Sequence, residues 1–244
     1  MGFVDKILSK SRDNKNLEGV TVAFLGDSVT QGCFELYPNA NGEYDTVFDG
    51  EYAYHKYFGK ILHTLYPSVP INIINAGISG GTATHGLERL KRDVLSHKPD
   101  LVVVCFGLND AVSGTIDEYT YALNQIFKKL ACERVETIFM TPNMMCDEVN
   151  PYLIDEPMLE TAQLCMNIQV NGTMDSYIKA ARTVCADNGI KICDCYNRWK
   201  KLSTRGVKIT DMLANRINHP TRTMNWLFAI SLIETVLDQT MDTR

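Results

Sequence analysis

The sequence lacks the features that mark membrane proteins and nucleic-acid-binding proteins. None of its apolar runs is long enough to cross a bilayer, and no block of lysine and arginine occurs. The net charge is −5, whereas binding to nucleic-acid phosphates requires a basic face. The first twenty residues also lack the apolar stretch of a secretory signal. We therefore expect a cytoplasmic protein with no membrane span and no nucleic-acid partner.

Several common catalytic and cofactor-binding motifs are also missing. The chain has no GxxxxGK[ST] phosphate loop, no GxGxxG after its first predicted strand and no HExxH zinc pattern. It has no GxSxG elbow, so the ordinary α/β-hydrolase arrangement is not supported. Among its eight cysteines, Cys193 and Cys195 are one residue closer than a CxxC pair, and no second pair follows. We expect buried free thiols, no metal and no cofactor.

The segments that are present alternate between strand-like and helix-like patterns over one domain, residues 1–244. Strand-like runs are nearly continuous in apolar residues, as expected where helices cover both faces of a sheet. Such alternation implies a parallel sheet with right-handed crossovers, so we predict a three-layer α/β/α sandwich. The five predicted strands are 19–26, 71–75, 101–107, 136–142 and 190–196. The predicted helices are 52–65, 86–97, 116–131, 173–188 and 222–238.

Two stretches interrupt this alternation. Residues 33–50 are rich in turn-forming Asn, Pro and Gly, and residues 143–165 carry two prolines and five acids. Both are predicted to be long loops. Long loops in compact domains often form lids or binding loops, although either stretch can equally be a surface insertion.

Polar clusters follow three of the predicted strands. They are Gly26-Asp27-Ser28, then residues 75–81 (NAGISGG), then Gly107-Leu108-Asn109-Asp110. Each cluster alone is an ordinary turn or helix cap. Ligands of open parallel sheets, however, bind beyond the carboxyl ends of the strands, and three such clusters together indicate a site there.

These clusters carry a resemblance to a known family. VAFLGDSVTQG (22–32) resembles the first block of the SGNH (GDSL-like) hydrolases, and NAGISGG resembles their second. FGLND (106–110) resembles the third block, and NHP (218–220) resembles the histidine end of the last. The four blocks appear in the family's order. The resemblance implies a flavodoxin-like sandwich with a five-stranded parallel sheet, and the activity of a serine esterase.

The resemblance also assigns roles to individual residues. Ser28 becomes the nucleophile, and His219 becomes the general base that takes its proton. Charge that develops on the carbonyl oxygen needs fixed donors. The resemblance assigns these to the backbone N–H groups of Ser28 and Gly80 and to the side-chain amide of Asn109.

One position departs from the family's pattern. The family has an Asp three residues before the histidine to orient the ring, and this chain has Arg216 there. Asn215 takes the acid's place if one residue is inserted, and Asp211 is the nearest carboxylate upstream. A backbone carbonyl is a further candidate. We hypothesise a Ser–His dyad with a non-carboxylate orienting group, with Asp211 as the alternative.

The function that this resemblance implies is hydrolysis of a small-molecule carboxylic ester through an acyl-serine intermediate. We expect a short acyl group on a carbohydrate, because the chain shows no apolar stripe to hold a long acyl chain. One alternative is acyl transfer to an alcohol. The other is a catalytically silent binding protein on the same scaffold, which the missing acid favours. The sequence leaves the oligomeric state open.

Overall fold

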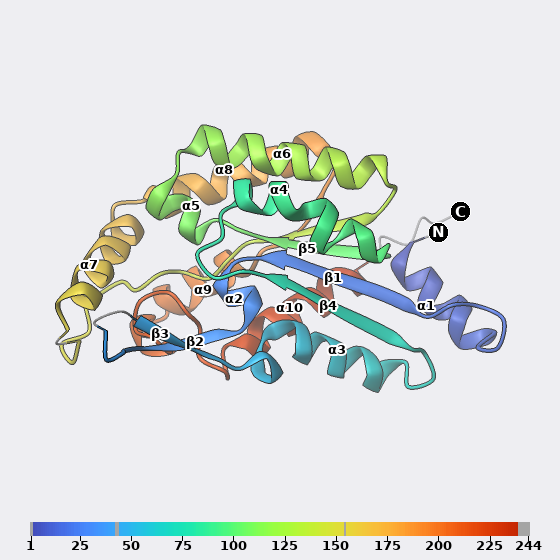
Figure 1. Cartoon of the computed structure of the whole chain (residues 1–244), viewed down its shortest axis with the longest axis horizontal. Helices are drawn as coiled ribbons and strands as arrows, with labels where there is room; N and C mark the ends of the chain where they lie inside the picture. Colours follow the sequence, from blue (N-terminus) through green and yellow to red (C-terminus); the bar gives the residue numbers. More distant parts are fainter. Residues whose placement is uncertain (1, 42–43, 154, 239–244) are drawn as a thin grey trace.

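The computed structural model describes residues 2–41, 44–153 and 155–238. Its centre is a parallel sheet made of Val20–Gly26 (β1), Ile71–Gly77 (β4), Leu101–Cys105 (β5), Glu136–Met140 (β6) and Lys191–Cys193 (β7). The strands lie in the order β4-β1-β5-β6-β7 (Figure 1). This is the flavodoxin-like order, in which the ligand site lies where the chain reverses direction across the sheet, next to the first strand. The predicted fold and the five predicted strands are confirmed, except that the end of the predicted strand 190–196 is helical, since β7 ends at Cys193 and a helix begins at Cys195.

The register of the sheet brings the polar clusters to one level. Gly26, the last residue of β1, lies opposite Gly77 on one side and Cys105 on the other. Asp27 and Ser28 therefore emerge between the ends of β4 and β5. Every residue of β5 is buried, as expected for a strand with both faces covered.

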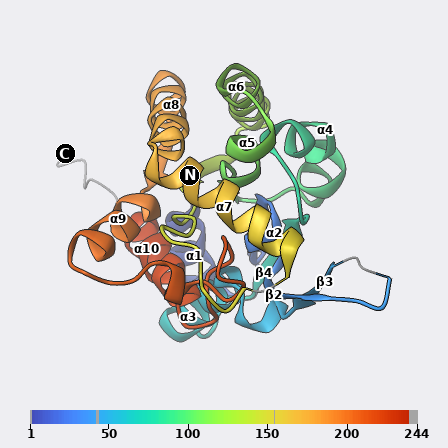
Figure 2. The ribbon, with the colours of Figure 1, turned by 90° about the vertical axis from the view of Figure 1, so that its left-hand side faces the viewer.

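Helices cover both faces of the sheet, as Figure 2 shows end on. Ala83–Asp93 (α4), Ile116–Cys132 (α6) and Thr173–Asn188 (α8) lie on one face. Tyr54–Leu65 (α3) and Asn225–Leu237 (α10) pack together on the other. The five helix predictions are confirmed with small changes at their ends. The remaining helical segments are Phe3–Arg12 (α1), Ser28–Gln31 (α2), Leu108–Ser113 (α5), Glu156–Val170 (α7), Cys195–Thr204 (α9), Gly50–Tyr52 (η1), Leu95–His97 (η2) and Thr210–Met212 (η3).

The helix α6 shows why these segments are helical. Its N-cap Thr115 accepts from the backbone N–H of Glu118, and the Glu118 carboxylate accepts from the Thr115 N–H in return. Its buried positions then recur at helical spacing and form one apolar stripe against the sheet. They are Tyr119, Ala122, Leu123, Ile126, Phe127 and Leu130.

The two predicted loops contain regular structure. Residues 33–50 include a hairpin of Cys33–Pro38 (β2) and Tyr44–Phe48 (β3), and residues 143–165 include the start of α7. The hairpin was missed because its strands are half exposed and show no alternation. The prolines of 143–165 favoured a loop, but Pro157 lies in the first turn of α7, where proline is tolerated. Both segments lie at the same end of the molecule as α2 (Figures 1 and 2).

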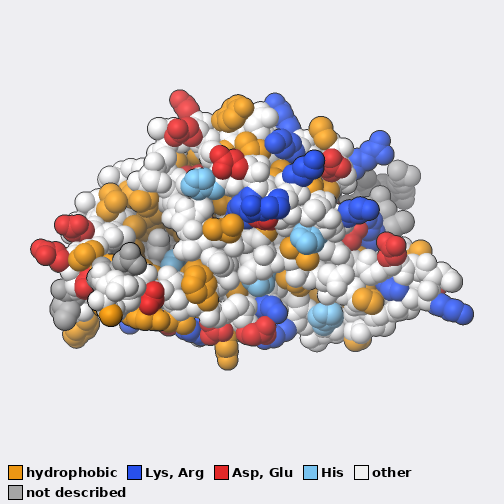
Figure 3. Space-filling view, viewed as in Figure 1, with side chains coloured by type: hydrophobic (Ala, Val, Ile, Leu, Met, Phe, Trp, Pro, Cys, Tyr) orange, Lys and Arg blue, Asp and Glu red, His pale blue; other side chains and the backbone are white. Residues whose placement is uncertain are grey.

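The surface charges, the cysteines and the helices each bear on a prediction made from the composition. Acidic and basic side chains are interspersed on the face that Figure 3 shows. All eight cysteines are unpaired, and seven of them are buried. Of the helices in the described ranges, none combines the length and the apolar character that a bilayer crossing requires.

Candidate active site

Ser28 lies at the first position of α2, directly after β1. Asp27 caps this short helix, and its carboxylate accepts a hydrogen bond from the N–H of Val29 at 3.0 Å. Gly77 permits the end of β4 to touch α2, because a Cβ at Gly77 would lie 2.2 Å from the backbone nitrogen of Gln31. The turn therefore holds Ser28 rigidly, with 4% of its surface exposed.

His219 lies in a loop that a single amide side chain organises. The Asn215 Oδ1 atom accepts from the backbone N–H groups of Ile217, Asn218 and His219, at 2.9–3.0 Å. The loop is also tied to β6's continuation, since Asn143 Nδ2 donates to the carbonyl of Asn218. This loop places Nε2 of His219 3.0 Å from Oγ of Ser28. The two residues, 191 positions apart in sequence, are therefore brought into hydrogen-bonding contact.

The other ring nitrogen of His219 faces a backbone carbonyl. Its Nδ1 atom lies 2.9 Å from the oxygen of Phe34, in β2. A carbonyl oxygen only accepts, so Nδ1 carries the proton in the neutral ring. Nε2 is then an acceptor, and the hydroxyl of Ser28 donates to it. The Phe34 carbonyl thus selects the tautomer that a general base for Ser28 requires.

The pKa of His219 is lowered, first by burial, while the Phe34 carbonyl and the negative charge of Glu35 act in the opposite direction. A lowered pKa keeps the ring neutral at neutral pH. The ring is thus able to accept a proton there.

The side chains predicted as candidates to orient the ring lie elsewhere. Asp211 pairs with Arg216 at 2.8 Å, and both side chains are more than two-fifths exposed. Asn215 acts on the loop backbone, as described above. No hydrogen bond joins either Asp211 or Asn215 to the imidazole ring within the described residues. In the structure the ring's partner is Phe34, because the hairpin that was predicted to be a loop brings its carbonyl beside Nδ1.

The three predicted oxyanion donors lie around the loop that follows β4. Asn109 Nδ2 donates to the carbonyl of Gly81 at 2.9 Å, and its second N–H makes no hydrogen bond within the described part of the chain. Gly80 has a φ of 73°, which favours glycine, although a Cβ there would meet no atom within 4 Å. The requirement at Gly80 is therefore conformational rather than steric.

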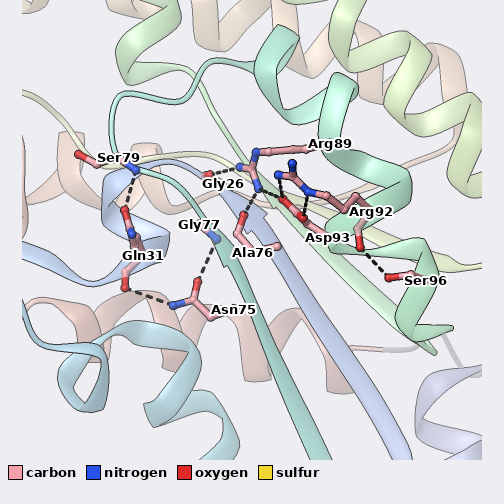
Figure 4. A network of polar contacts seen from close by, with 10 residues as sticks. All are labelled: Gly26, Gln31, Asn75, Ala76, Gly77, Ser79, Arg89, Arg92, Asp93 and Ser96. Atoms are coloured by element: carbon pink, nitrogen blue, oxygen red, sulfur yellow. Dashed lines mark hydrogen bonds and ion pairs between the residues drawn. The ribbon is translucent and has the colours of Figure 1, made fainter.

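A polar network holds this loop against α2 (Figure 4). The Gln31 side chain accepts from the N–H of Ser79 at 2.7 Å, and Asn75 Nδ2 donates to the Gln31 carbonyl. Asn75 also accepts from the N–H of Gly77. The segment that carries Gly80 is thus fixed relative to the helix that begins with Ser28.

Arg89, on α4, joins the ends of two strands. Its buried guanidinium donates to the carbonyls of Gly26 at 2.7 Å and Ala76 at 2.6 Å (Figure 4). This role could not be predicted from the sequence, because Arg89 and Asp93 stand at the i, i+4 spacing of a surface ion pair. Arg89 ties β1 and β4 together where their polar clusters begin.

Two buried carboxyl groups lie beneath the site. Burial raises the pKa of Asp27 to about 7 and that of Asp110 to about 6. One oxygen of Asp110 accepts from the N–H of Ala83 at 2.9 Å. The other oxygen of each carboxyl is buried without a partner in the described structure. Asp110 links the third cluster to the start of α4.

A serine hydroxyl bonded to a neutral imidazole, at the carboxyl end of a flavodoxin-like sheet, is the arrangement found in one class of serine hydrolases. The comparison with known families agrees. Residues 24–227 match the GDSL-like lipase/acylhydrolase family, and the chain belongs to that family.

Individual relatives point the same way. An acetylxylan esterase from Geobacillus stearothermophilus is 35% identical over 92 residues, a stretch that covers 38% of this chain and 40% of the esterase. A solved structure of an acetylxylan esterase from that organism superposes with a TM-score of 0.67 at 20% identity, over 93% of this chain and 98% of the other. An α/β hydrolase from the metagenome of Lake Arreo, Spain, gives 0.65 at 20% identity, over 90% and 95%. The acetylxylan esterase has also been solved as catalytic mutants of a serine, an aspartate and a histidine.

Proposed function

We propose that this protein is a serine esterase in which Ser28 attacks a carboxylic ester and His219 takes the proton of the Ser28 hydroxyl. One observation carries the proposal: Oγ of Ser28 lies 3.0 Å from Nε2 of His219, and the Phe34 carbonyl leaves that nitrogen as an acceptor. A serine hydroxyl is a weak nucleophile until an adjacent base activates it. The geometry supports His219 as that base, because its Nε2 faces Oγ of Ser28 while its Nδ1 faces a carbonyl oxygen.

The reaction then proceeds in two halves. Oγ of Ser28 bonds to the ester carbon while its proton passes to Nε2 of His219, and the carbonyl oxygen becomes an oxyanion. The C–O bond to the alcohol breaks, and His219 returns the proton to that alcohol. Water next attacks the acyl-serine, again losing a proton to His219. The bond between the acyl carbon and Oγ of Ser28 then breaks, His219 returns the proton to Oγ, and the carboxylic acid leaves.

The oxyanion is stabilised by the N–H groups of Ser28 and Gly80 and by the amide of Asn109. Within the described residues, neither backbone N–H donates a hydrogen bond, so both remain for a substrate. The Asn109 amide keeps one free N–H beside Gly81. Each such donor is worth about 3 kcal/mol in the barrier.

The substrate class that we propose is an acetyl ester of a carbohydrate. The relative that is 35% identical over 92 residues is an acetylxylan esterase, and a structure with the same fold is named an acetyl-xylooligosaccharide esterase. These names support short acyl groups on sugars over long-chain lipids. The support is by analogy with these relatives.

The cytoplasm is the compartment that we propose for this activity. The supporting observation is that all eight cysteines are unpaired. Free thiols persist in reducing compartments and become disulfides in oxidising ones.

The test compares wild type with Ser28→Ala on p-nitrophenyl acetate, acetylated xylooligosaccharides and a long-chain ester. We expect hydrolysis of the two acetyl substrates by wild type only, with weak activity on the long chain. Preference for the long chain would contradict the carbohydrate substrate. Acylated product that forms only when a sugar acceptor is added would indicate transfer instead of hydrolysis. No turnover and no reaction with an organophosphate would indicate a binding protein.

A further inference from the structure

Arg222, three residues after His219, binds the hairpin that carries Phe34, at Glu35 in β2 and at Asp49 directly after β3. Its guanidinium makes two bonds to the Glu35 carboxylate, at 2.6 and 3.1 Å, and one from Nε to Asp49 at 2.9 Å. The guanidinium carbon also lies 4.3 Å from the centroid of the Phe34 ring. A planar guanidinium that pairs in this forked way fixes geometry as well as charge.

These contacts close a ring of interactions around the base. His219 donates to the carbonyl of Phe34, and the next residue, Glu35, is held by Arg222 from the same loop as His219. Asp49, after β3, donates its own N–H to the carbonyl of Gly32 at 2.8 Å. The hairpin is therefore held at Glu35, next to the Phe34 carbonyl that orients the ring, and at Asp49, directly after β3.

The charges of this cluster have the sign that the missing acid would supply. Two carboxylates and one guanidinium leave the cluster with one net negative charge, and Glu35 is the member whose charge acts on the imidazole. Arg222 lowers the pKa of Glu35, so the carboxylate stays ionised, and the charge of Glu35 raises the pKa of His219. Negative charge favours the imidazolium that forms as His219 takes the proton from Ser28.

We propose that Arg222, Glu35 and Asp49 replace the family's orienting acid. Arg222 is a positioning residue that fixes the Phe34 carbonyl against Nδ1 of His219. The cluster supplies negative charge near the ring without bonding to it directly. This inference rests on the proposed esterase function. The side chains of the cluster are 29–43% exposed. The forked pairing of Arg222 with Glu35 and the third charge of Asp49 set the cluster apart from an isolated surface ion pair, which contributes little because solvent screens it.

The first experiment compares Arg222→Met, Arg222→Lys and Glu35→Gln in the full chain, with p-nitrophenyl acetate over a range of pH. Arg222→Met is expected to lower kcat by roughly ten- to a hundredfold with little change in KM, because a small misplacement of the base is costly. Arg222→Lys keeps the charge but loses the fork, and is expected to fall between wild type and Arg222→Met. The matched control is Arg198→Met, which breaks the exposed ion pair of Arg198 with Glu234 and leaves kcat unchanged.

The pH profile separates this role from simple loss of structure. Glu35→Gln removes the charge that favours the imidazolium, so the acid limb of kcat/KM moves to lower pH. Arg222→Met leaves two carboxylates without their counter-charge, so the limb moves to higher pH. If Arg222→Met lowers kcat without moving the limb, and Arg222→Lys restores nothing, the cluster is only structural and the proposal is overturned. Unchanged kcat in Arg222→Met overturns it equally.

A second measurement keeps the inference testable if no ester is hydrolysed. The ring nitrogens of His219 are titrated by NMR in wild type, Glu35→Gln and Arg222→Met. The His219 signal is identified by its absence from the spectrum of His219→Gln. A lower pKa of His219 in Glu35→Gln and a higher one in Arg222→Met support the cluster even if the esterase proposal fails. Equal titration curves in all three proteins would refute it, whatever the activity.

Discussion

The carbonyl oxygen of Phe34 lies 2.9 Å from Nδ1 of His219, where members of the family place a carboxylate. A neutral carbonyl selects the tautomer as an acid does, but it brings no charge of its own. Measurements on variants can therefore distinguish a Ser28–His219 dyad, oriented by the Phe34 carbonyl, from a triad in which the Asp211 carboxylate orients the ring.

Asp211→Asn is the most direct test of a triad of Ser28, His219 and Asp211. We expect kcat within about twofold of wild type and a stability change within about 1 kcal/mol, because the exposed pair of Asp211 and Arg216 is screened by solvent. His219→Ala, assayed on the same substrate, serves as the reference for full loss. If Asp211→Asn lost as much activity as His219→Ala, the dyad hypothesis would be wrong.

Asn109→Ala is expected to lower kcat by roughly a hundred- to a thousandfold while KM changes little, because the lost amide acts mainly on the oxyanion. Steady-state kinetics with an acetyl ester measures both constants. Asn188→Ala is the matched control, since it removes an amide that bonds to Asn124 and the carbonyl of Val184, away from the site. Equal losses in the two variants would contradict the role of Asn109.

Asn215→Ala is expected to destabilise the protein by about 1–3 kcal/mol and to lower kcat, because three loop N–H groups lose their acceptor. Asn215→Asp keeps an oxygen at that place and is expected to recover most of the stability. Urea unfolding and kinetics on both variants provide the comparison. A stable and fully active Asn215→Ala would mean that the loop needs no such acceptor.

Arg89→Met is expected to cost about 2–4 kcal/mol, because the carbonyls of Gly26 and Ala76 lose a charged, buried donor. Urea unfolding measures this change. The control is Arg92→Met, whose partner is also Asp93 but whose side chain is 74% exposed. A loss of similar size in the control would show that the carbonyl contacts of Arg89 contribute little.

Asp27 predicts a pH dependence of stability. Its pKa is about 7 in the folded protein and near 3.8 when exposed, so between these values the folded state binds more protons than the unfolded one. Its contribution to stability is therefore fully present below pH 4 and is lost as the pH rises through 7. As the pH rises from 4 to 8, the free energy of unfolding of Asp27→Asn is expected to increase by on the order of 3 kcal/mol relative to that of wild type. Denaturant unfolding at both values tests this, and a difference independent of pH would contradict it.

The positions of Ser28, Gly80, Asn109 and His219 could be anticipated because each follows a strand or precedes a helix in a recognisable block. Parallel strands end at one edge of the sheet, so residues far apart in sequence were expected to meet there. The roles assigned to these residues remain predictions until they are measured.

Other parts of the site could not be found from the sequence. Every residue has a carbonyl, so nothing marked Phe34, and its half-exposed hairpin carried no strand pattern. Arg222 pairs with Glu35 across 187 positions, a contact that no local spacing predicts. Arg89 has the spacing of a surface ion pair, and only the fold turns its guanidinium toward the strand ends.

The central claim, that His219 activates Ser28 as the nucleophile, is tested most directly by covalent labelling. Wild type, Ser28→Ala and His219→Gln are treated with an organophosphate at neutral pH, and the adduct is located by peptide mass spectrometry. We predict one adduct on Ser28 in wild type, none in Ser28→Ala, and labelling in His219→Gln that is slower by a large factor. An unlabelled wild type, or an adduct on another residue, would contradict the account.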